Sequence, residues 1–320
     1  MAVIHAEGLT KHYGSVRALE GLDLEVEQGD AFGYLGPNGS GKTTTIRMLL
    51  GLIRPTSGRV RVLGGDPERD AVAIHRRLAY VPGEAALWPQ LTGAETLHLL
   101  GRLHGSVDEA CRIELVERFE LDPGKRVRAY SKGNRQKVSL VAALSARAEL
   151  LVLDEPTSGL DPLMEQVFRE CVREAKDRGQ TLFLSSHVLP EVEALCDRVA
   201  ILRSGRLVEV GTLDAMRLGS ALAIEATFGD GPVPDVREVA GVLDSTVTVE
   251  GSTLRCRVEG PVAPLLGLLA AAGADRVVSR EPSLEELFLT YYADRAEAPP
   301  SGRAAREGTP SRASGRRPAP

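Results

Sequence analysis

The sequence of 320 residues predicts an α/β fold with a largely parallel sheet. Apolar runs of strand length alternate with longer amphipathic runs over the first two thirds of the chain. A glycine-rich loop joins one of these strands to a helix, and another strand, LLVLD at 150–154, runs into an acidic pair. Because strands that alternate with helices form βαβ units, we expect these strands to be parallel.

The first elements follow from local patterns. Leu22, Leu24 and Val26 alternate with polar residues and predict an early half-buried strand. AFGYL at 31–35 predicts a strand that enters the glycine-rich loop, and TTTIRMLLGL at 43–52 predicts the helix that follows the loop.

A helical insert is expected at about 85–130. Thr92 and Glu95 have the spacing of a capping box, and VDEACRIELVERFEL at 107–121 places apolar residues near the helical period. The elements expected after the insert are a helix from about Ser131, the strand at 150–154, an amphipathic helix that ends before Gly179, and the strand TLFLSS at 181–186.

Residues 218–294 predict a small α+β domain. STVTVEGSTLRCRVEG at 245–260 alternates about a Glu-Gly turn like a hairpin. A helix near 262–272, a short strand at 276–278 and a capped helix, SLEELFLTYY at 283–292, are expected to follow. Residues 295–320 are rich in Pro, Ala, Gly, Ser and Arg and predict a disordered tail.

Composition excludes several classes of protein. The net charge of −5 and an aromatic content of 4% disfavour a nucleic-acid partner. The four cysteines form no CxxC pair, so neither a disulfide framework nor a zinc site is expected. The N-terminus lacks a signal-peptide pattern, and the longest apolar stretch, 261–274, is well short of the roughly 20 residues that span a bilayer. A soluble chain is expected, for which a membrane role requires a partner.

The stretch GPNGSGKT at 36–43 matches the phosphate-binding pattern GxxxxGK[ST] between a strand and a helix. Its glycines allow backbone N–H groups to surround phosphates, Lys42 neutralises the β and γ charges, and the Thr43 hydroxyl is a ligand for Mg²⁺. The predicted nucleotide-binding residues in this loop are Gly36, Pro37, Asn38, Gly39, Ser40, Gly41, Lys42, Thr43 and Thr44.

The acidic pair after the strand at 150–154 supplies the second part of such a site. Asp154 is expected in the Mg²⁺ shell, and Glu155 is placed to orient or deprotonate the attacking water. The alternative is an exposed acidic strand end with no function.

The stretch YSKGNRQK at 130–137 predicts a second anion site. Ser131 caps the first turn of a helix, Gly133 allows a ligand to approach the backbone, and basic side chains lie on the same turns. The sequence thus has two phosphate-binding elements in one expected domain.

These motifs, taken in order with SGLD at 158–161 and the strand-terminal His187, resemble those of ABC-transporter nucleotide-binding subunits over residues 1–217. The resemblance implies a P-loop NTPase fold of the ABC type, with the insert at 85–130 as its helical subdomain. It also implies that Tyr13 stacks on adenine, and that ATP and Mg²⁺ are the cofactors.

The resemblance also explains the second anion site. In that family two nucleotide-binding domains pack head to tail, and the signature segment of one domain closes on the γ-phosphate held by the other. A homodimer is the default here. The residues implied in this assembly are the signature Ser131, Lys132, Gly133 and Asn134, the γ-phosphate contact His187, and the D-loop Ser158, Gly159, Leu160 and Asp161.

Two departures from the family pattern stand out. The usual signature LSGGQ is replaced by YSKGN, and the glutamine expected after YVP is replaced by Gly83 in YVPGEAALWP at 80–89. One interpretation is that Gly83 only loosens the loop, with Glu84 as a candidate substitute near the metal. The other is that the following residues, including Trp88, couple the ATPase to a cytoplasmic helix of the membrane partner.

The opening of the chain, SKGNRQK and the C-terminal EPSLEELFLTYY are similar to the drug and antibiotic exporter branch of bacterial ABC ATPases. This similarity implies an ATPase coupled to efflux of drug, antibiotic or lipid-like compounds, a separate integral membrane permease, and a peripheral place on the cytoplasmic face of the cell membrane. The alternatives are a soluble ABC-type ATPase and a nucleotide-dependent regulator that is not coupled to transport.

Overall fold

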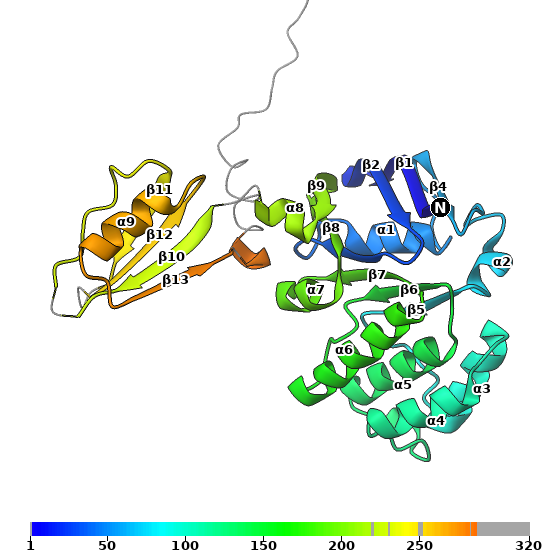
Figure 1. Cartoon of the computed structure of the whole chain (residues 1–320). Helices are drawn as coiled ribbons and strands as arrows, with labels where there is room; N and C mark the ends of the chain where they lie inside the picture. Colours follow the sequence, from blue (N-terminus) through cyan, green and yellow to red (C-terminus); the bar gives the residue numbers. More distant parts are fainter. Residues whose placement is uncertain (1, 219–220, 230, 249–251, 282, 287–320) are drawn as a thin grey trace, which may run out of the picture.

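The computed structural model describes residues 2–218, 221–229, 231–248, 252–281 and 283–286. Within these ranges the chain forms a 6-stranded sheet, a 3-stranded sheet and a 4-stranded sheet (Figure 1). The predicted tail at 295–320 lies outside the described residues. No helix in the described part of the chain is long and apolar enough to span a membrane.

The 6-stranded sheet confirms the predicted parallel core. Its strand order is β5-β6-β7-β3-β8-β9, and β9 alone in this sheet runs antiparallel to its neighbour. The strands are β3 (Ala31–Leu35), β5 (Leu78–Val81), β6 (Leu150–Asp154), β7 (Thr181–Ser186), β8 (Arg198–Arg203) and β9 (Arg206–Thr212).

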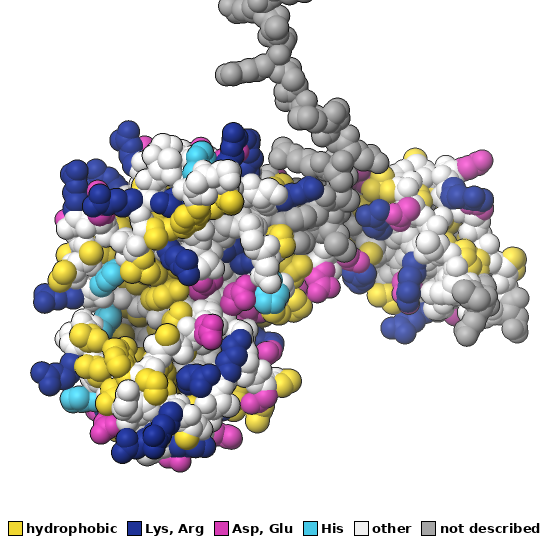
Figure 2. All heavy atoms as spheres, turned by 180° about the vertical axis from the view of Figure 1, so that it is seen from behind, with side chains coloured by type: hydrophobic (Ala, Val, Ile, Leu, Met, Phe, Trp, Pro, Cys, Tyr) yellow, Lys and Arg dark blue, Asp and Glu magenta, His cyan; other side chains and the backbone are white. Residues whose placement is uncertain are grey.

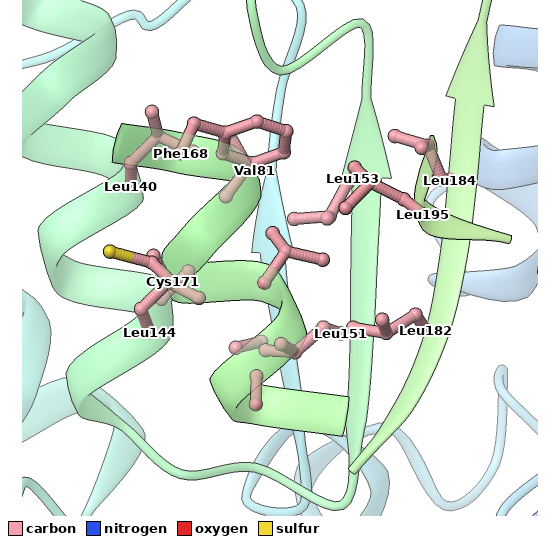
Figure 3. Packing of buried hydrophobic residues seen from close by; sticks show 14 of the residues in the cluster. Val81, Leu140, Leu144, Leu151, Leu153, Phe168, Cys171, Leu182, Leu184 and Leu195 are labelled. Atoms are coloured by element: carbon pink, nitrogen blue, oxygen red, sulfur yellow. The ribbon is translucent and has the colours of Figure 1, made fainter. Parts of the chain in front are cut away.

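Layers on both faces bury this sheet, which is why its strands are nearly continuous apolar runs. Leu151 and Leu153 of β6 face the helices α5 (Lys132–Ser145), α6 (Pro162–Asp177) and α7 (Leu189–Leu195), as Figure 3 shows for this cluster. Leu150 and Val152 face the other layer, which contains α1 (Lys42–Leu49).

That other layer also contains an antiparallel sheet that sequence analysis did not predict. Its order is β2-β1-β4, formed by β1 (Ala2–Tyr13), β2 (Val16–Glu27) and β4 (Ser57–Val62). The predicted strand through Leu22, Leu24 and Val26 is β2, and all three side chains are buried. It belongs to this sheet because β2 pairs with β1 through a two-stranded hairpin rather than with a parallel neighbour.

The predicted helical insert contains α3 (Gly93–His104), α4 (Glu109–Arg118) and the 3-10 helix η1 (Val127–Ala129); α2 (Ala71–His75) precedes it. The capping box is confirmed. The Glu95 backbone N–H donates to Thr92 Oγ1 at 3.2 Å, and the Thr92 N–H donates to Glu95 Oε2 at 2.8 Å. These two bonds fix where α3 begins.

The C-terminal sheet has the order β11-β12-β10-β13 and is antiparallel throughout. It follows α8 (Leu213–Leu218) and consists of β10 (Leu222–Thr227), β11 (Val242–Val247), β12 (Thr253–Val258) and β13 (Arg276–Arg280). Helix α9 (Ala263–Ala271) buries Leu265 and Leu269 against one face of the sheet. The predicted hairpin, helix and short strand are confirmed, whereas β10 was missed.

The last predicted helix is described only at its start. Leu284 to Glu286 are helical, and the Ser283 and Glu286 side chains each accept a hydrogen bond from the other residue's backbone N–H. The rest of the predicted helix lies outside the described residues. Leu284 is fully buried and joins the apolar cluster that contains Leu213 and Met216 of α8. The chain therefore returns from the C-terminal sheet to the large core.

Candidate nucleotide site

The glycine-rich loop runs from the end of β3 to the start of α1, as the motif predicted. Gly41 caps α1 with φ 114°, and a Cβ at this position would lie 2.6 Å from the Ala18 carbonyl oxygen. Only glycine fits both the left-handed backbone and this close approach. The first N–H groups of α1 are thereby left facing the loop, where a phosphate is stabilised by the helix N-terminus.

Lys42 lies at the centre of the loop and is 5% exposed. Its Nζ donates to the Gly36 carbonyl at 2.6 Å and the Pro37 carbonyl at 3.3 Å, and it lies 3.7 Å from Glu155 Oε1. Burial lowers the pKa of Lys42, while the negative charges of Glu155 and Asp154 raise it. A phosphate bound in the loop would pair with the Lys42 ammonium group, which burial has partly desolvated.

Asp154 and Thr43 fit the requirements of a metal site. Thr43 Oγ1 donates to Asp154 Oδ2 at 3.3 Å, so the predicted ligands meet at the end of β6. Asp154 is 5% exposed, and the Thr43 and Ser185 side chains only partly offset the burial of its carboxylate. Burial raises the pKa of Asp154. A divalent cation would bind the carboxylate and favour its charged form.

Glu155 joins the phosphate loop to His187. Its Oε1 lies 3.2 Å from His187 Nδ1 and 3.7 Å from Lys42 Nζ. The backbone of Glu155 is left-handed, with φ 47°, which is uncommon for a residue with a side chain and occurs here also at Leu63, Glu120, Arg147 and Ser204. The structure therefore brings the two predicted catalytic side chains together beside the predicted phosphate cradle.

The signature segment contacts the D-loop of its own chain. Ser131 caps α5 and accepts a hydrogen bond from the Asn134 N–H at 3.2 Å, as predicted from the sequence. Lys132 Nζ donates to Ser158 Oγ at 2.7 Å. A Cβ at Gly133 would lie only 2.4 Å from the Gly159 carbonyl oxygen, so the two segments touch through their backbones.

The remaining D-loop residues lie at the start of α6. Asp161 caps that helix by accepting a hydrogen bond from the Met164 N–H at 3.0 Å. Leu160 packs partly buried against the large core. The described contacts of Asp161 are thus those of a helix cap within its own chain.

The loop with Gly83 passes directly beside Asp154 and Glu155. A Cβ at Gly83 would lie 3.1 Å from the Asp154 carbonyl oxygen, which leaves little space for a larger residue. Gln136, which the site prediction missed, anchors this loop: its Nε2 donates to the carbonyls of Pro82 at 3.0 Å and Pro156 at 3.1 Å. Its place in YSKGNRQK, one turn after the signature, was the available signal.

Tyr13 lies at the end of β1, exposed, with Lys11 Nζ 5.1 Å from the centre of its ring. The β1–β2 hairpin borders the phosphate loop, because Ala18 of β2 approaches Gly41. Glu84 and Trp88 are exposed on the loop after β5.

Known proteins resemble this chain in sequence and in fold. Residues 19–158 match the family model described as ABC transporter. The chain is 37% identical over 311 residues to the daunorubicin resistance ATP-binding protein DrrA3 of Streptomyces coeruleorubidus, a match that covers 91% of this chain and 96% of that protein. The chain belongs to the ATP-binding subunits of ABC transporters. This ABC subunit binds ATP and hydrolyses it to ADP and phosphate in a reaction coupled to transport.

Other relatives agree with this assignment. The ABC subunit is 34% identical to the bacitracin transport ATP-binding protein BcrA of Bacillus licheniformis, over 90% of this chain and 96% of that protein. A solved ATP-binding subunit of an ABC transporter is 32% identical, with a TM-score of 0.63, over 67% of this chain and 92% of that chain. A dimeric ATP-binding cassette with bound ADP and phosphate, 22% identical with a TM-score of 0.59 over 66% of this chain and 98% of that chain, shares the fold. The alternative of an ATPase or regulator outside transport is not favoured.

Proposed function

We propose that this chain is the nucleotide-binding subunit of an exporter whose permease is a separate polypeptide. Support comes from relatives named for daunorubicin resistance, bacitracin transport and, in Paraburkholderia xenovorans, Nod factor export at 35% identity over 90% of this chain and 96% of that protein. In this proposal residues 1–217 are the ATP-binding domain on the cytoplasmic face of the membrane, and residues 218–294 are an accessory domain. Drug, antibiotic or lipid-like compounds are the proposed cargo.

The observation that carries the proposed hydrolysis site is the position of Glu155 Oε1 between Lys42 Nζ and His187 Nδ1. In the proposed mechanism Glu155 accepts a proton from the attacking water, Lys42 and His187 stabilise the γ-phosphate, and Tyr13 stacks on the adenine. Thr43 and Asp154 would hold Mg²⁺, which supplies charge neutralisation on the phosphates.

The rate of ATP hydrolysis by the Glu155→Gln variant tests the role of Glu155 as general base. The amide keeps the size of the side chain but cannot take the proton, so we expect turnover to fall at least about 100-fold. ATP binding should persist because the contacts of the phosphate loop are unchanged. Turnover within about threefold of the wild type would contradict the proposed role of Glu155 as a general base.

ATP-driven dimerisation is the proposed power stroke. One chain contains both a phosphate loop and an anion-binding signature, but Lys132 and Gly133 of the signature contact the D-loop of their own chain. We propose that the Ser131 helix terminus of a second copy completes each ATP site. Two equivalent sites then form across a twofold axis.

The permease is proposed to dock in an apolar groove of about 420 Å³ between the loop after β5 and helix α3. Trp88, Leu103 and Leu52 line it and are exposed in the described structure, and Figure 2 shows hydrophobic side chains gathered on this part of the surface. An exposed apolar groove of this kind suits a short amphipathic helix of the partner. Gly83 and Glu84 precede Trp88 on the same loop and are the other candidates for coupling.

Trp88→Ala tests the groove. We expect transport by the assembled exporter to fall more than the ATPase of the purified chain, because truncating a central aromatic contact costs about 2 kcal/mol or more of binding. Leu163→Ala, on exposed Leu163 of α6, is the matched surface control. Unchanged transport and unchanged association with the permease would refute this docking site.

A further inference from the structure

A buried carboxylate holds the turn that carries His187. The turn runs from Ser186, the last residue of β7, to Leu189, the first residue of α7. The Val188 N–H donates to Ser186 Oγ at 3.0 Å, and Ser186 Oγ donates to Glu191 Oε2 at 2.7 Å. The Ser186 hydroxyl therefore links the residues on either side of His187, and the Glu191 carboxylate accepts the proton of that hydroxyl.

A carboxylate at position 191 does not stabilise the fold. Glu191 is 4% exposed, and hydrogen bonds from the Ser186 and Thr157 side chains favour its charged form less than burial opposes it. Burial raises the pKa of Glu191 to about 6, so the charged form is disfavoured at this position. An apolar side chain would fill the same space under α7 without the cost of burying a carboxylate. A buried group that weakens the fold and contacts a loop of the site points to a role in that site.

The His187 ring depends on this turn for its position. Its side chain is 53% exposed, so packing alone does not fix it. Nδ1 faces Glu155 Oε1 at 3.2 Å, which leaves Nε2 as the nitrogen available to a phosphate. The backbone of the turn sets the direction of the His187 Cβ, and that direction decides where Nε2 lies when Nδ1 contacts Glu155.

We infer that Glu191 is a positioning residue for hydrolysis: it fixes the turn from Ser186 to Val188 so that His187 faces the γ-phosphate beside Glu155. This inference rests on the proposed contact of His187 with the γ-phosphate. Glu191 acts through hydrogen bonds to the turn and touches no reacting atom. The first-turn position of an acid in α7 also suits the helix dipole, but an exposed acid would serve that purpose equally well.

The test compares four variants of the full-length chain: Glu191→Ala, Glu191→Gln, His187→Ala and Glu193→Ala. Glu193 is the matched control, because it lies on the same helix but pairs with Arg217 instead of the turn. Turnover is measured per site that binds ADP, so that misfolded protein does not count. ADP lacks the γ-phosphate and reports the phosphate loop without His187.

We expect Glu191→Ala to lower kcat per ADP-binding site at least about tenfold, because a reacting group displaced by about 1 Å loses up to about a hundredfold in rate. The Kd for ADP should stay within about threefold of the wild type, since the phosphate loop is unchanged. Glu191→Gln should retain most of kcat, because its amide oxygen still accepts the Ser186 hydrogen bond.

Three outcomes would overturn the inference. One is a normal kcat for Glu191→Ala when His187→Ala is impaired; the proposed role of His187 would then survive. Another is an equal loss in Glu191→Gln and Glu191→Ala, and a third is the same loss in Glu193→Ala. A normal kcat for His187→Ala would instead refute the proposed contact of His187 with the γ-phosphate, on which the inference rests.

Discussion

Glu155 is the residue that connects the phosphate loop to His187. Its left-handed backbone, with φ 47°, turns the chain at the end of β6, and its carboxylate then lies within 3.7 Å of Lys42 Nζ and 3.2 Å of His187 Nδ1. Strain of this kind costs about 1–3 kcal/mol and persists where the surrounding structure enforces it. The motifs of Lys42 and Glu155, and for His187 the resemblance to ABC subunits, predicted that all three act on one nucleotide. In the structure they meet because each follows a strand of one parallel sheet or opens the helix after it.

The role of Glu191, which contacts Ser186 next to His187, could not be predicted from the sequence. It is one of two glutamates on the short helix α7, and its burial depends on how that helix packs on β7. Only the three-dimensional contact with Ser186 separates it from the partly exposed Glu193. Motifs identify residues that contact ligands, but they do not identify residues that position them.

The raised pKa of Glu191 predicts a pH-dependent penalty on folding. Because the folded pKa of about 6 lies above the ordinary value of 4.5, the penalty is absent below the ordinary value and is complete above the folded pKa. Relative to the wild type, Glu191→Gln should therefore gain about 2 kcal/mol of unfolding free energy as the pH rises from about 4 to about 7. Denaturant titrations of both proteins across this range measure the difference. A difference that stays constant with pH would contradict the prediction.

At the scale of elements, the signature helix α5 and the D-loop before α6 form one unit. Lys132 binds Ser158, and Gly133 lies against the Gly159 carbonyl with no space for a Cβ. This contact explains why the second glycine of the family signature is kept here although the first is lysine. The hydrogen bond to Ser158 also gives Lys132 a partner within its own chain before any dimer forms.

Gly133→Ala should therefore weaken the ATP-driven dimer. The added methyl group pushes the two backbones of the single chain apart, at a cost of about 1–3 kcal/mol to its fold. The displaced signature should then fit the nucleotide of the second copy less well. ATP binding by the single chain should not change. Light scattering in the Glu155→Gln background measures dimerisation, with Gly267→Ala on α9, where a Cβ meets nothing within 4 Å, as the control. Equal dimer affinity for both variants would exclude the predicted coupling.

Elements with local signals were predicted well, and those that depend on distant partners were not. The capping box at Thr92, the Ser131 cap and the apolar run of β6 each follow from neighbouring residues. The β1–β2 hairpin was missed although its pairing is local. Strands β4 and β10 were missed because they pair with strands that are not their neighbours in the sequence. The tight approach of Gly83 to Asp154 likewise has no sequence signature.

At the scale of the whole molecule, the C-terminal sheet is tied back to the ATP-binding core. Leu284 is fully buried in the cluster with Leu213 and Met216. Beside it Arg217 pairs with Glu193 of α7 and lies 3.9 Å from Glu281. Helix α7, which begins two residues after His187, is therefore in contact with the segment that carries the C-terminal domain.

Leu284→Ala tests how firmly the two parts are joined. Removing a fully buried leucine leaves a cavity and should lower the unfolding free energy by about 2–5 kcal/mol. Leu266→Ala, on the exposed side of α9, should cost much less and is the control. Urea titration followed by far-ultraviolet circular dichroism measures the unfolding free energy. An equal, small effect of both substitutions would show that Leu284 adds nothing to that core.

The central claim is that two copies of this chain close on ATP, each completing the other's site. The most direct measurement is the solution mass of Glu155→Gln with and without ATP, because blocked hydrolysis should trap the closed state. The account predicts a shift to dimer that requires ATP and is lost in the additional variant Ser131→Arg, which disrupts the signature cap. A protein that binds ATP but remains a monomer would contradict it.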